Sequence, residues 1–181
     1  LKFVIKNGFS KLDFATNSEI TDKDAVIIPV VYTDGFITDR ESQPSVIELP
    51  NTKATPGQSI NLPLGAKGLR GVGSFTFRIT YDPAVLSFNG VSNIISGTVD
   101  AKADNGILTL GYFNTSGLDL ADGKILDLMF DYTSGNTDLI IDKNLSEVTD
   151  INGVKLNDVL LADGSVIQNK IPTINVTVKD T

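Results

Sequence analysis

Residues 73–88 hold the pattern that most restricts how this chain can fold. Between Gly73 and Tyr81, every second side chain is large and apolar, and the side chains between them are small or polar. A period of two turns the apolar side chains to one face of a β-strand and the polar ones to the other. Asp82-Pro83 ends this strand, because proline fixes φ and restricts the residue before it. An apolar run then restarts at Val85 and reaches a turn at Asn89-Gly90.

Short apolar segments separated by turn signals fill residues 45–168, and we expect nine strands there. The turn signals include Gly71, Gly117 and Asp122-Gly123, and no segment has the 3.6-residue periodicity of an amphipathic helix. Short strands at this spacing are typical of two antiparallel sheets packed face to face. The sequence therefore predicts an all-β fold, a two-sheet antiparallel β-sandwich of the nine-stranded jelly-roll type. The expected strands span residues 45–50, 59–64, 73–82, 86–94, 98–104, 107–114, 124–134, 138–143 and 159–168.

The composition of the chain argues against several classes of function. The net charge of −7 argues against nucleic acid as a partner, because binding to phosphates needs a basic surface. The chain contains no Cys, His or Trp, which excludes zinc sites, Cys or His nucleophile systems and Ser-His-Asp triads within it. No run of about 18 apolar residues is present, so we expect no membrane insertion. No group of residues suggests catalysis, and we expect a protein that is not an enzyme.

Part of the sequence occurs twice, about 128 residues apart. Glu147-Val-Thr-Asp150 matches Glu19-Ile-Thr-Asp22, and the Asp-Gly turn at 163–164 matches the one at 34–35. A period this long indicates tandem domains. Residues 1–43 are expected to be the closing strands of a preceding homologous module or a strand-exchanging arm, with strands over 1–6 and 26–32. Residues 44–169 are expected to form a complete module. Residues 170–181 are expected to form a linker and the first strand of a following module.

Several motifs of the central module together resemble the cohesin modules of cellulosomal and related scaffold proteins. They are, in order, the Pro-Gly turn and strand of residues 54–63, the corner Tyr81-Asp-Pro-Ala-Val-Leu86, the strand of residues 107–113, the strand that follows Gly123, and Asp163-Gly-Ser-Val-Ile167. The resemblance covers most of residues 45–168. It implies a flattened jelly-roll sandwich that binds a dockerin, which is a small helical domain with calcium-binding loops.

The resemblance also implies where the partner binds. In cohesins the binding face lies on the sheet of strands three, five, six and eight, and alternation gives the outward side chains of these strands. Phe113 is the most informative, since an exposed aromatic side chain can anchor a partner; the alternative is that Phe113 is core and Tyr112 points outward. Arg78 either reaches a carboxylate across the interface or lies on a solvated strand face. The expected partner-binding residues are Ser74, Thr76, Arg78, Thr80, Asp100, Lys102, Thr109, Gly111 and Phe113.

Acidic residues in two hairpins raise the question of a calcium site. Asp100, Asp104 and Asn105 lie on one hairpin, and Asp119 and Asp122 lie on another. An EF-hand loop needs oxygen ligands at alternate positions, a glycine and a distal bidentate Glu, and neither hairpin has this pattern. We therefore expect no metal and no cofactor on this chain, and we expect calcium on the dockerin partner instead.

Three functions fit the sequence, in this order. The first is a non-catalytic, cohesin-like scaffold module that docks dockerin-type partners in an extracellular polysaccharide-degrading or surface assembly. The second is a structural tandem repeat of a surface adhesin or extracellular filament, whose partners are neighbouring copies of itself joined by strand exchange. The third is a carbohydrate-binding module, which is poorly supplied with stacking side chains because the chain has no Trp and four Tyr. An acidic, cysteine-free β-rich chain best fits a secreted or cell-surface bacterial protein.

Overall fold

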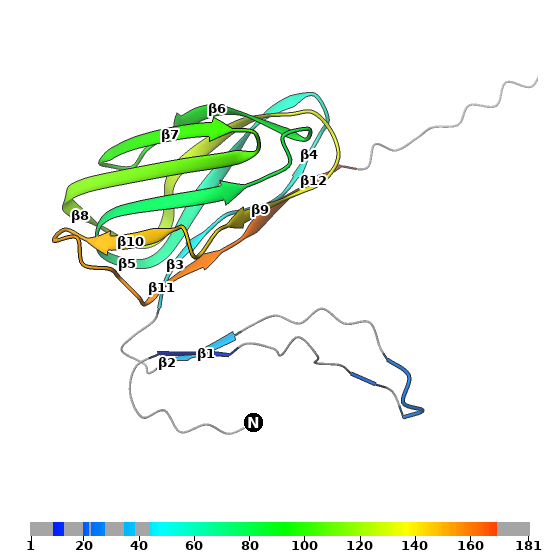
Figure 1. Cartoon of the computed structure of the whole chain (residues 1–181), viewed down its shortest axis with the longest axis horizontal. Helices are drawn as coiled ribbons and strands as arrows, with labels where there is room; N and C mark the ends of the chain where they lie inside the picture. The colour runs from blue at the N-terminus through cyan, green and yellow to red at the C-terminus, as the bar shows by residue number, and fades with distance from the viewer. Residues whose placement is uncertain (1–8, 13–19, 22, 28–34, 39–43, 170–181) are drawn as a thin grey trace, which may run out of the picture. The chain divides into compact units, whose positions relative to one another are not determined.

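The computed structural model describes residues 9–12, 20–21, 23–27, 35–38 and 44–169. The chain divides into two compact units, Leu1–Pro44 and Ser45–Thr181. Over the described residues all regular secondary structure is β-strand, as the sequence predicts (Figure 1). Within these ranges, no helix is long and apolar enough to cross a membrane.

In the first unit, the described residues include one pair of short strands. β1 (Phe9–Leu12) pairs antiparallel with β2 (Gly35–Thr38). Between them in sequence, an isolated antiparallel bridge joins Thr21 to Ile27. Three expected segments lie wholly or largely outside the described residues: the strand over 1–6, the apolar run over 26–32, and the linker and strand over 170–181.

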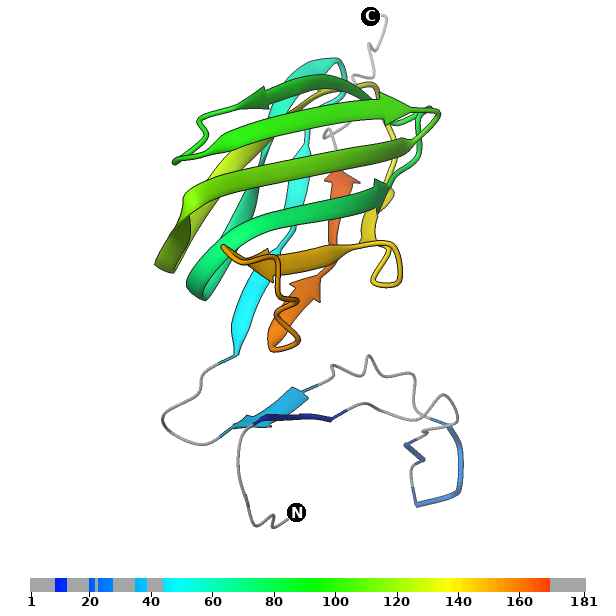
Figure 2. The same ribbon diagram turned by 60° about the vertical axis from the view of Figure 1, so that its left-hand side comes forward.

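The second unit contains ten strands in two layers that face each other (Figures 1 and 2). Sheet I runs, in spatial order, from β10 through the C-terminal part of β5 and the N-terminal part of β8 to β7. The end of β9 also pairs with β5 in this sheet, at Ile79 and Thr80. Sheet II runs from β6 through the C-terminal part of β8 and the N-terminal part of β5 to β3 with β11, and continues with β4, β12 and β9. The two-sheet sandwich predicted from the sequence is confirmed. The bounds are β3 Ser45–Glu48, β4 Asn51–Ala54, β5 Gln58–Thr80, β6 Leu86–Ser92, β7 Thr98–Asp104, β8 Ile107–Tyr132, β9 Thr137–Ile141, β10 Glu147–Asp150, β11 Val159–Ala162 and β12 Gly164–Gln168.

Two long strands belong to both sheets, which differs from the expected strand boundaries. The segments expected as separate strands over 59–64 and 73–82 are parts of β5, and those over 107–114 and 124–134 are parts of β8. Both strands turn from one sheet to the other at glycines with positive φ, Gly71 at 61° and Gly117 at 76°. A Cβ added at Gly117 would lie 3.3 Å from the Cα of Gly71, so the two corners are adjacent. Glycine ends a strand in many chains, but here it permits a bulge that bends the strand without ending it.

The short strands at the edges also differ from the expected list. The segment 159–168 is divided at Asp163 into β11 and β12, whereas the segment 45–50 contains β3 alone. β4 follows it after Leu49-Pro50, and the expected list does not include this strand. The first and last strands pair in parallel, β3 with β11 and β4 with β12, whereas the sequence predicts antiparallel sheets throughout. β10 is an additional strand that the sequence analysis did not assign.

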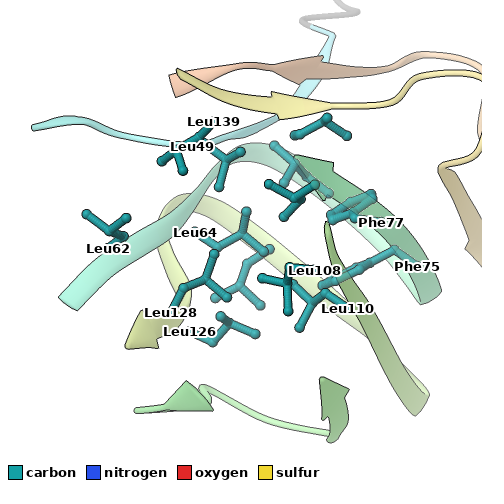
Figure 3. Close-up of a cluster of buried hydrophobic side chains, with 14 of the residues drawn as sticks. Leu49, Leu62, Leu64, Phe75, Phe77, Leu108, Leu110, Leu126, Leu128 and Leu139 are labelled. Atoms are coloured by element: carbon teal, nitrogen blue, oxygen red, sulfur yellow. The ribbon is translucent and has the colours of Figure 1, made fainter. Parts of the chain in front are cut away.

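The core lies between the two sheets and is built from the alternating residues (Figure 3). Phe75, Phe77 and Ile79 each expose 1% or less of their surface, which confirms the predicted inward face of residues 73–81. The ring of Phe75 stacks on Phe77 at 4.4 Å between centroids and on Tyr112 at 4.8 Å. Full burial of a Phe side chain stabilises the fold by about 1.5–3 kcal/mol. Sheet I is therefore held rigidly on its inner side, and its outer side is left to solvent.

Candidate functional site

The outer face of sheet I, which we call the sheet I face, is formed by alternate residues of β10, β5, β8 and β7 and by the end of β9. Residues directly opposite each other on neighbouring strands share a row, because the ladder register pairs them in space. All nine residues expected to bind a partner lie in these rows. Their role in binding stays a prediction. The rows are Thr149–Ser74–Phe113–Thr98, Glu147–Thr76–Gly111–Asp100, Arg78–Thr109–Lys102 and Ile140–Thr80–Ile107–Asp104.

Phe113 gives the sheet I face its largest exposed apolar side chain on a strand. It exposes 57% of its surface, whereas its neighbour Tyr112 exposes 3%. The Tyr112 hydroxyl accepts a hydrogen bond from the Asn114 amide at 3.1 Å, so the buried ring keeps a polar partner. The structure therefore places Tyr112 in the core and Phe113 outside, which settles the register that the sequence left open.

Two shallow hollows lie on the sheet I face, each with a volume of about 470 Å³ and open to solvent. The first includes the place where Gly111 lacks a side chain between Thr76 and Asp100, and it extends over the row of Arg78, Thr109 and Lys102 to Ile107 and Asp104. The second hollow lies between β5 and the segment around β10, and its lining includes Ser74, Thr76, Leu145, Glu147, Thr149 and Lys155. Shallow open hollows of this kind suit the side chains of a protein partner better than an enclosed small molecule.

The charged side chains of the sheet I face are not neutralised within the module. Arg78, Lys102, Asp100, Asp104 and Glu147 form no ion pair within 4.0 Å with any described residue. Elsewhere in the module such pairs do form. Lys124 lies 2.7 Å from Asp127, and Lys67 lies 2.9 Å from Glu48. The unpaired charges are therefore available to groups outside the module.

The loop after β10 is shaped by Asp150. Its carboxylate accepts hydrogen bonds from the backbone N–H of Val154 at 2.9 Å and of Asn152 at 2.8 Å. These bonds, the one from Val154 first, hold the pKa of Asp150 below its ordinary value of 3.8. The same loop ends in the isolated bridge from Thr149 to Lys155, so it fixes the edge of sheet I beside the second hollow.

Sequence reasoning missed several residues of the sheet I face. Glu147 and Thr149 flank the buried Val148 on β10, and this alternation was present in the sequence. The segment was read only as half of a repeat, since four residues are too short to stand out as a strand. Alternation along β7 and β8 would also have given the remaining outward residues, which are Thr98, Asp104 and Ile107.

The acidic hairpins have structural roles in the described part of the chain. Asn105-Gly106 forms a tight turn with φ values of 45° and 79°. The Asp119 carboxylate accepts a hydrogen bond from the Gly71 N–H at 2.6 Å, which ties the two strand corners together. Among the described residues, no group of three or more acidic, His or Cys side chains has a metal-binding arrangement. Calcium stays a prediction for the partner alone.

The fold and the sheet I face define a class of β-sandwich interaction module, and comparison gives the family. The model of the cohesin domain matches residues 45–167, so this chain belongs to the cohesin family, whose members are non-catalytic protein-interaction modules. The resemblance read from the sequence is thereby confirmed. No protein among curated sequences matches the chain.

Solved structures share the fold at low sequence identity. A non-cellulosomal cohesin from Archaeoglobus fulgidus is 20% identical, with a TM-score of 0.62, and the match covers 71% of this chain and 93% of that one. The sixth cohesin of scaffoldin B from Acetivibrio cellulolyticus, solved in complex with a Cel5 dockerin, is 19% identical, with a TM-score of 0.61 and coverage of 70% and 100%. A cohesin–dockerin complex of OlpA and Doc918 from Clostridium thermocellum gives 18% identity, a TM-score of 0.61 and coverage of 70% and 100%.

Proposed function

We propose that residues 45–168 dock a dockerin-type protein through the sheet I face and act without catalysis. The observation that carries the proposal is Phe113, a large aromatic side chain exposed over 57% of its surface on an inner strand of sheet I, at one end of a mostly polar face. Interfaces concentrate their binding energy in a few aromatic and Arg residues surrounded by polar contacts. Several solved structures of similar fold were determined as complexes with dockerins, which supports this class of partner.

Binding to dockerins tests this proposal directly. The whole chain is titrated calorimetrically with a panel of dockerins that includes the Cel5 dockerin and Doc918, with calcium and then with a chelator. We expect at least one calcium-dependent complex, and we expect Phe113→Ala to weaken it about thirtyfold, as for a hot-spot residue. Ile167→Ala is the matched control, since Ile167 is a similarly exposed apolar residue, at 44%, on β12 in sheet II. A panel without any binder, or binders indifferent to Phe113→Ala, would contradict the proposal.

We also propose that the protein carries such modules in series, with residues 1–43 as the closing strands of a preceding copy. The ladder registers support this. Leu12 pairs with Gly35 in the first unit, and Leu139 pairs with Gly164 in the second. Residues 12 and 139 differ by 127, and residues 35 and 164 differ by 129, which are offsets around the 128 seen in the sequence.

The turn between these strands repeats as well. The bridge from Thr21 to Ile27 corresponds, at an offset of 128 on both sides, to the bridge from Thr149 to Lys155. Ala25 has a φ of 62°, and Gly153, 128 residues later, has a φ of 77°. A positive φ is uncommon for a residue with a Cβ, so its recurrence at this position argues against coincidence.

Burial supports the same interpretation. Ile20 exposes 46% of its surface, whereas its counterpart Val148 exposes 4% in the complete module. This is the difference expected between a segment of a sandwich and the same segment in the complete sandwich. A module with an earlier copy on the same chain would hold several partners at once and gain avidity from their linkage.

A graft tests the serial arrangement. Residues 137–169 of the complete module are replaced by residues 10–40, and folding is followed by circular dichroism and urea unfolding. We expect a cooperatively folding β-protein. The control graft begins at Lys11 instead of Ser10, which shifts the first grafted strand by one residue and turns its apolar side chains to the wrong face. Equal behaviour of the two grafts would refute the homology of the segments. Recovery of the unmodified chain as concentration-dependent oligomers would favour strand exchange between neighbouring copies instead.

The proposed site of action is extracellular or at the cell surface. The family and the acidic, cysteine-free composition support it. Surface labelling of intact cells that express the full-length protein tests it, and exclusive recovery from the cell interior would contradict it.

A further inference from the structure

We propose that Arg78 selects the partner by its charge, and that the partner presents a carboxylate over Arg78 beside an aliphatic side chain that enters the hollow at Gly111. This inference rests on the proposed docking function and adds the chemistry of the partner surface.

The position of Arg78 distinguishes it from the other charges of the sheet I face. It is half-buried on β5, an inner strand of sheet I, with Thr76 and Thr80 beside it on the same strand and Thr109 directly across. Its backbone N–H donates to the Ser146 hydroxyl at 3.1 Å, and no carboxylate of a described residue lies within 4.0 Å of the guanidinium. One acidic residue lies next to it, since the backbone N–H of Asp142 donates to the Arg78 carbonyl at 2.8 Å. The Asp142 carboxylate instead accepts hydrogen bonds from the backbone N–H groups of Asn144 and Leu145, at 3.0 and 3.3 Å. The other neighbours of Arg78 are hydroxyl groups, so its guanidinium has no paired carboxylate within the described residues.

The other acidic residues near Arg78 lie on the edge strands of the face. Asp100 and Asp104 are on β7, two strands away from Arg78, and Glu147 is on β10 in the neighbouring row. Neighbouring strands are about 4.8 Å apart, so the aspartates stand about 10 Å from the β5 strand that carries Arg78. They alternate along β7 with Lys102, which leaves the β7 edge with charges of both signs.

A partner that covers sheet I removes water from Arg78 first, because Arg78 is near the middle of the face. A guanidinium that loses water without gaining an anion destabilises the complex, whereas a carboxylate forms two parallel hydrogen bonds with it. The same partner without a carboxylate at this point is therefore disfavoured, and a partner with a Lys or Arg there is excluded by repulsion.

The hollow at Gly111 indicates the second feature of the partner, the aliphatic side chain. Gly111 lies on the neighbouring strand and in the next row from Arg78, a diagonal spacing of about 7–8 Å. A Cβ added at Gly111 would meet only the Asp100 carbonyl oxygen, at 3.8 Å, so the space above it is empty of protein. Residues four apart on a helix are separated by about 6 Å along its axis. A partner helix that carries an aliphatic residue and an Asp or Glu one turn apart fits both positions.

Selection from a library tests the inference. The Cel5 dockerin is displayed with its exposed helix positions randomised, and binders are sorted on the whole 181-residue chain. We expect Asp or Glu to be enriched next to an aliphatic residue, one helical turn away. For a selected binder, Arg78→Gln and the binder's carboxylate-to-amide change should each weaken binding at least about tenfold, and the double change should cost little more than either alone.

Matched variants separate charge from general damage. Arg70→Gln removes the same charge at an exposed position of the same strand, outside both hollows, and should change the affinity less than about twofold. Arg78→Lys keeps the charge but loses the paired hydrogen bonds and should give an intermediate loss. Gly111→Leu should block binding without lowering the melting temperature. Melting curves of all variants identify any that fail to fold. If Arg78→Gln fails to fold, the affinity of Arg78→Lys decides whether Arg78 contributes to binding.

Each outcome bears on one of the two proposals. Binders that need Phe113 but tolerate Arg78→Gln, or that carry no Asp or Glu, overturn the charge selection and leave the docking function standing. A library without any binder sensitive to Phe113→Ala contradicts the docking function, and the charge selection fails with it.

Discussion

Replacing Gly73 by Ala tests whether the edge of sheet I is set by contact between backbones. Gly73 is buried on β5, beside the end of β10. A Cβ at this position would overlap the Asp150 carbonyl oxygen and would lie 2.6 Å from the Ile151 Cα. These are backbone atoms of a neighbouring strand and cannot rotate away, so β10 must move outward.

The size of the effect follows from this geometry. Overpacking of a well-packed site costs typically 1–3 kcal/mol, and rigid neighbours place Gly73→Ala at about 3 kcal/mol. Gly111→Ala is the matched control on the same sheet. Its Cβ has 3.8 Å to the nearest atom, so the smaller entropy of the unfolded chain should stabilise the variant by about 0.5 kcal/mol. The two variants should thus differ by about 3.5 kcal/mol in the free energy of unfolding.

Urea unfolding followed by far-UV circular dichroism measures this difference. With a urea dependence of about 1.5 kcal/mol per molar, the midpoints of the two variants should lie about 2 M apart. Gly73→Ala should also weaken partner binding, because Glu147 and Thr149 move with β10. Equal midpoints for the two variants would refute the idea that backbone contact at Gly73 positions β10.

Three further predictions concern the buried side of the module. Burial alone would raise the pKa of Asp127, but the hydrogen bonds from Lys124 and Asn93 outweigh it and hold the pKa below 3.8. Asp127 therefore stabilises the fold above its ordinary pKa, and this stabilisation is lost as the pH falls through the lower pKa of the folded state. In Asp127→Asn, the free energy of unfolding should fall less steeply with decreasing pH below about pH 4. An unchanged pH dependence in this range would contradict the prediction. Tyr132→Phe should cost about 1 kcal/mol in urea unfolding, because it removes the 2.8 Å hydrogen bond to the Gly135 carbonyl, and a neutral result would mean that water replaces the bond. Phe77→Ala should cost about 3–5 kcal/mol, and a loss below 1 kcal/mol would show that the core collapses around the cavity.

The faces of the central strands could be predicted from the sequence because alternation is a local property. Phe75, Phe77 and Ile79 face the core, and Arg78 and Thr76 face outward, as a period of two requires. The rows of the sheet I face could not be predicted in the same way. They depend on register between strands far apart in sequence, such as Thr76 opposite both Gly111 and Glu147.

The strand corners could not be predicted from the sequence, because a glycine can either end a strand or bend it. Gly71 and Gly117 read as ends of strands, yet each keeps β5 or β8 continuous through a bend. Whether a glycine ends a strand or bends it depends on whether the partner strand bends at the same place. Here the two glycines are in contact, and that contact is visible only in three dimensions.

The parallel pairing of the outermost segments has a mechanical consequence. β3 begins the module and β11 approaches its end, and they run side by side in the same direction, as do β4 and β12. Tension applied between the two ends of the module therefore pulls these neighbours lengthwise past each other. All hydrogen bonds between them carry the load together and cannot open one after another as in a zipper. A module of this topology is therefore expected to resist unfolding when its two ends are pulled apart.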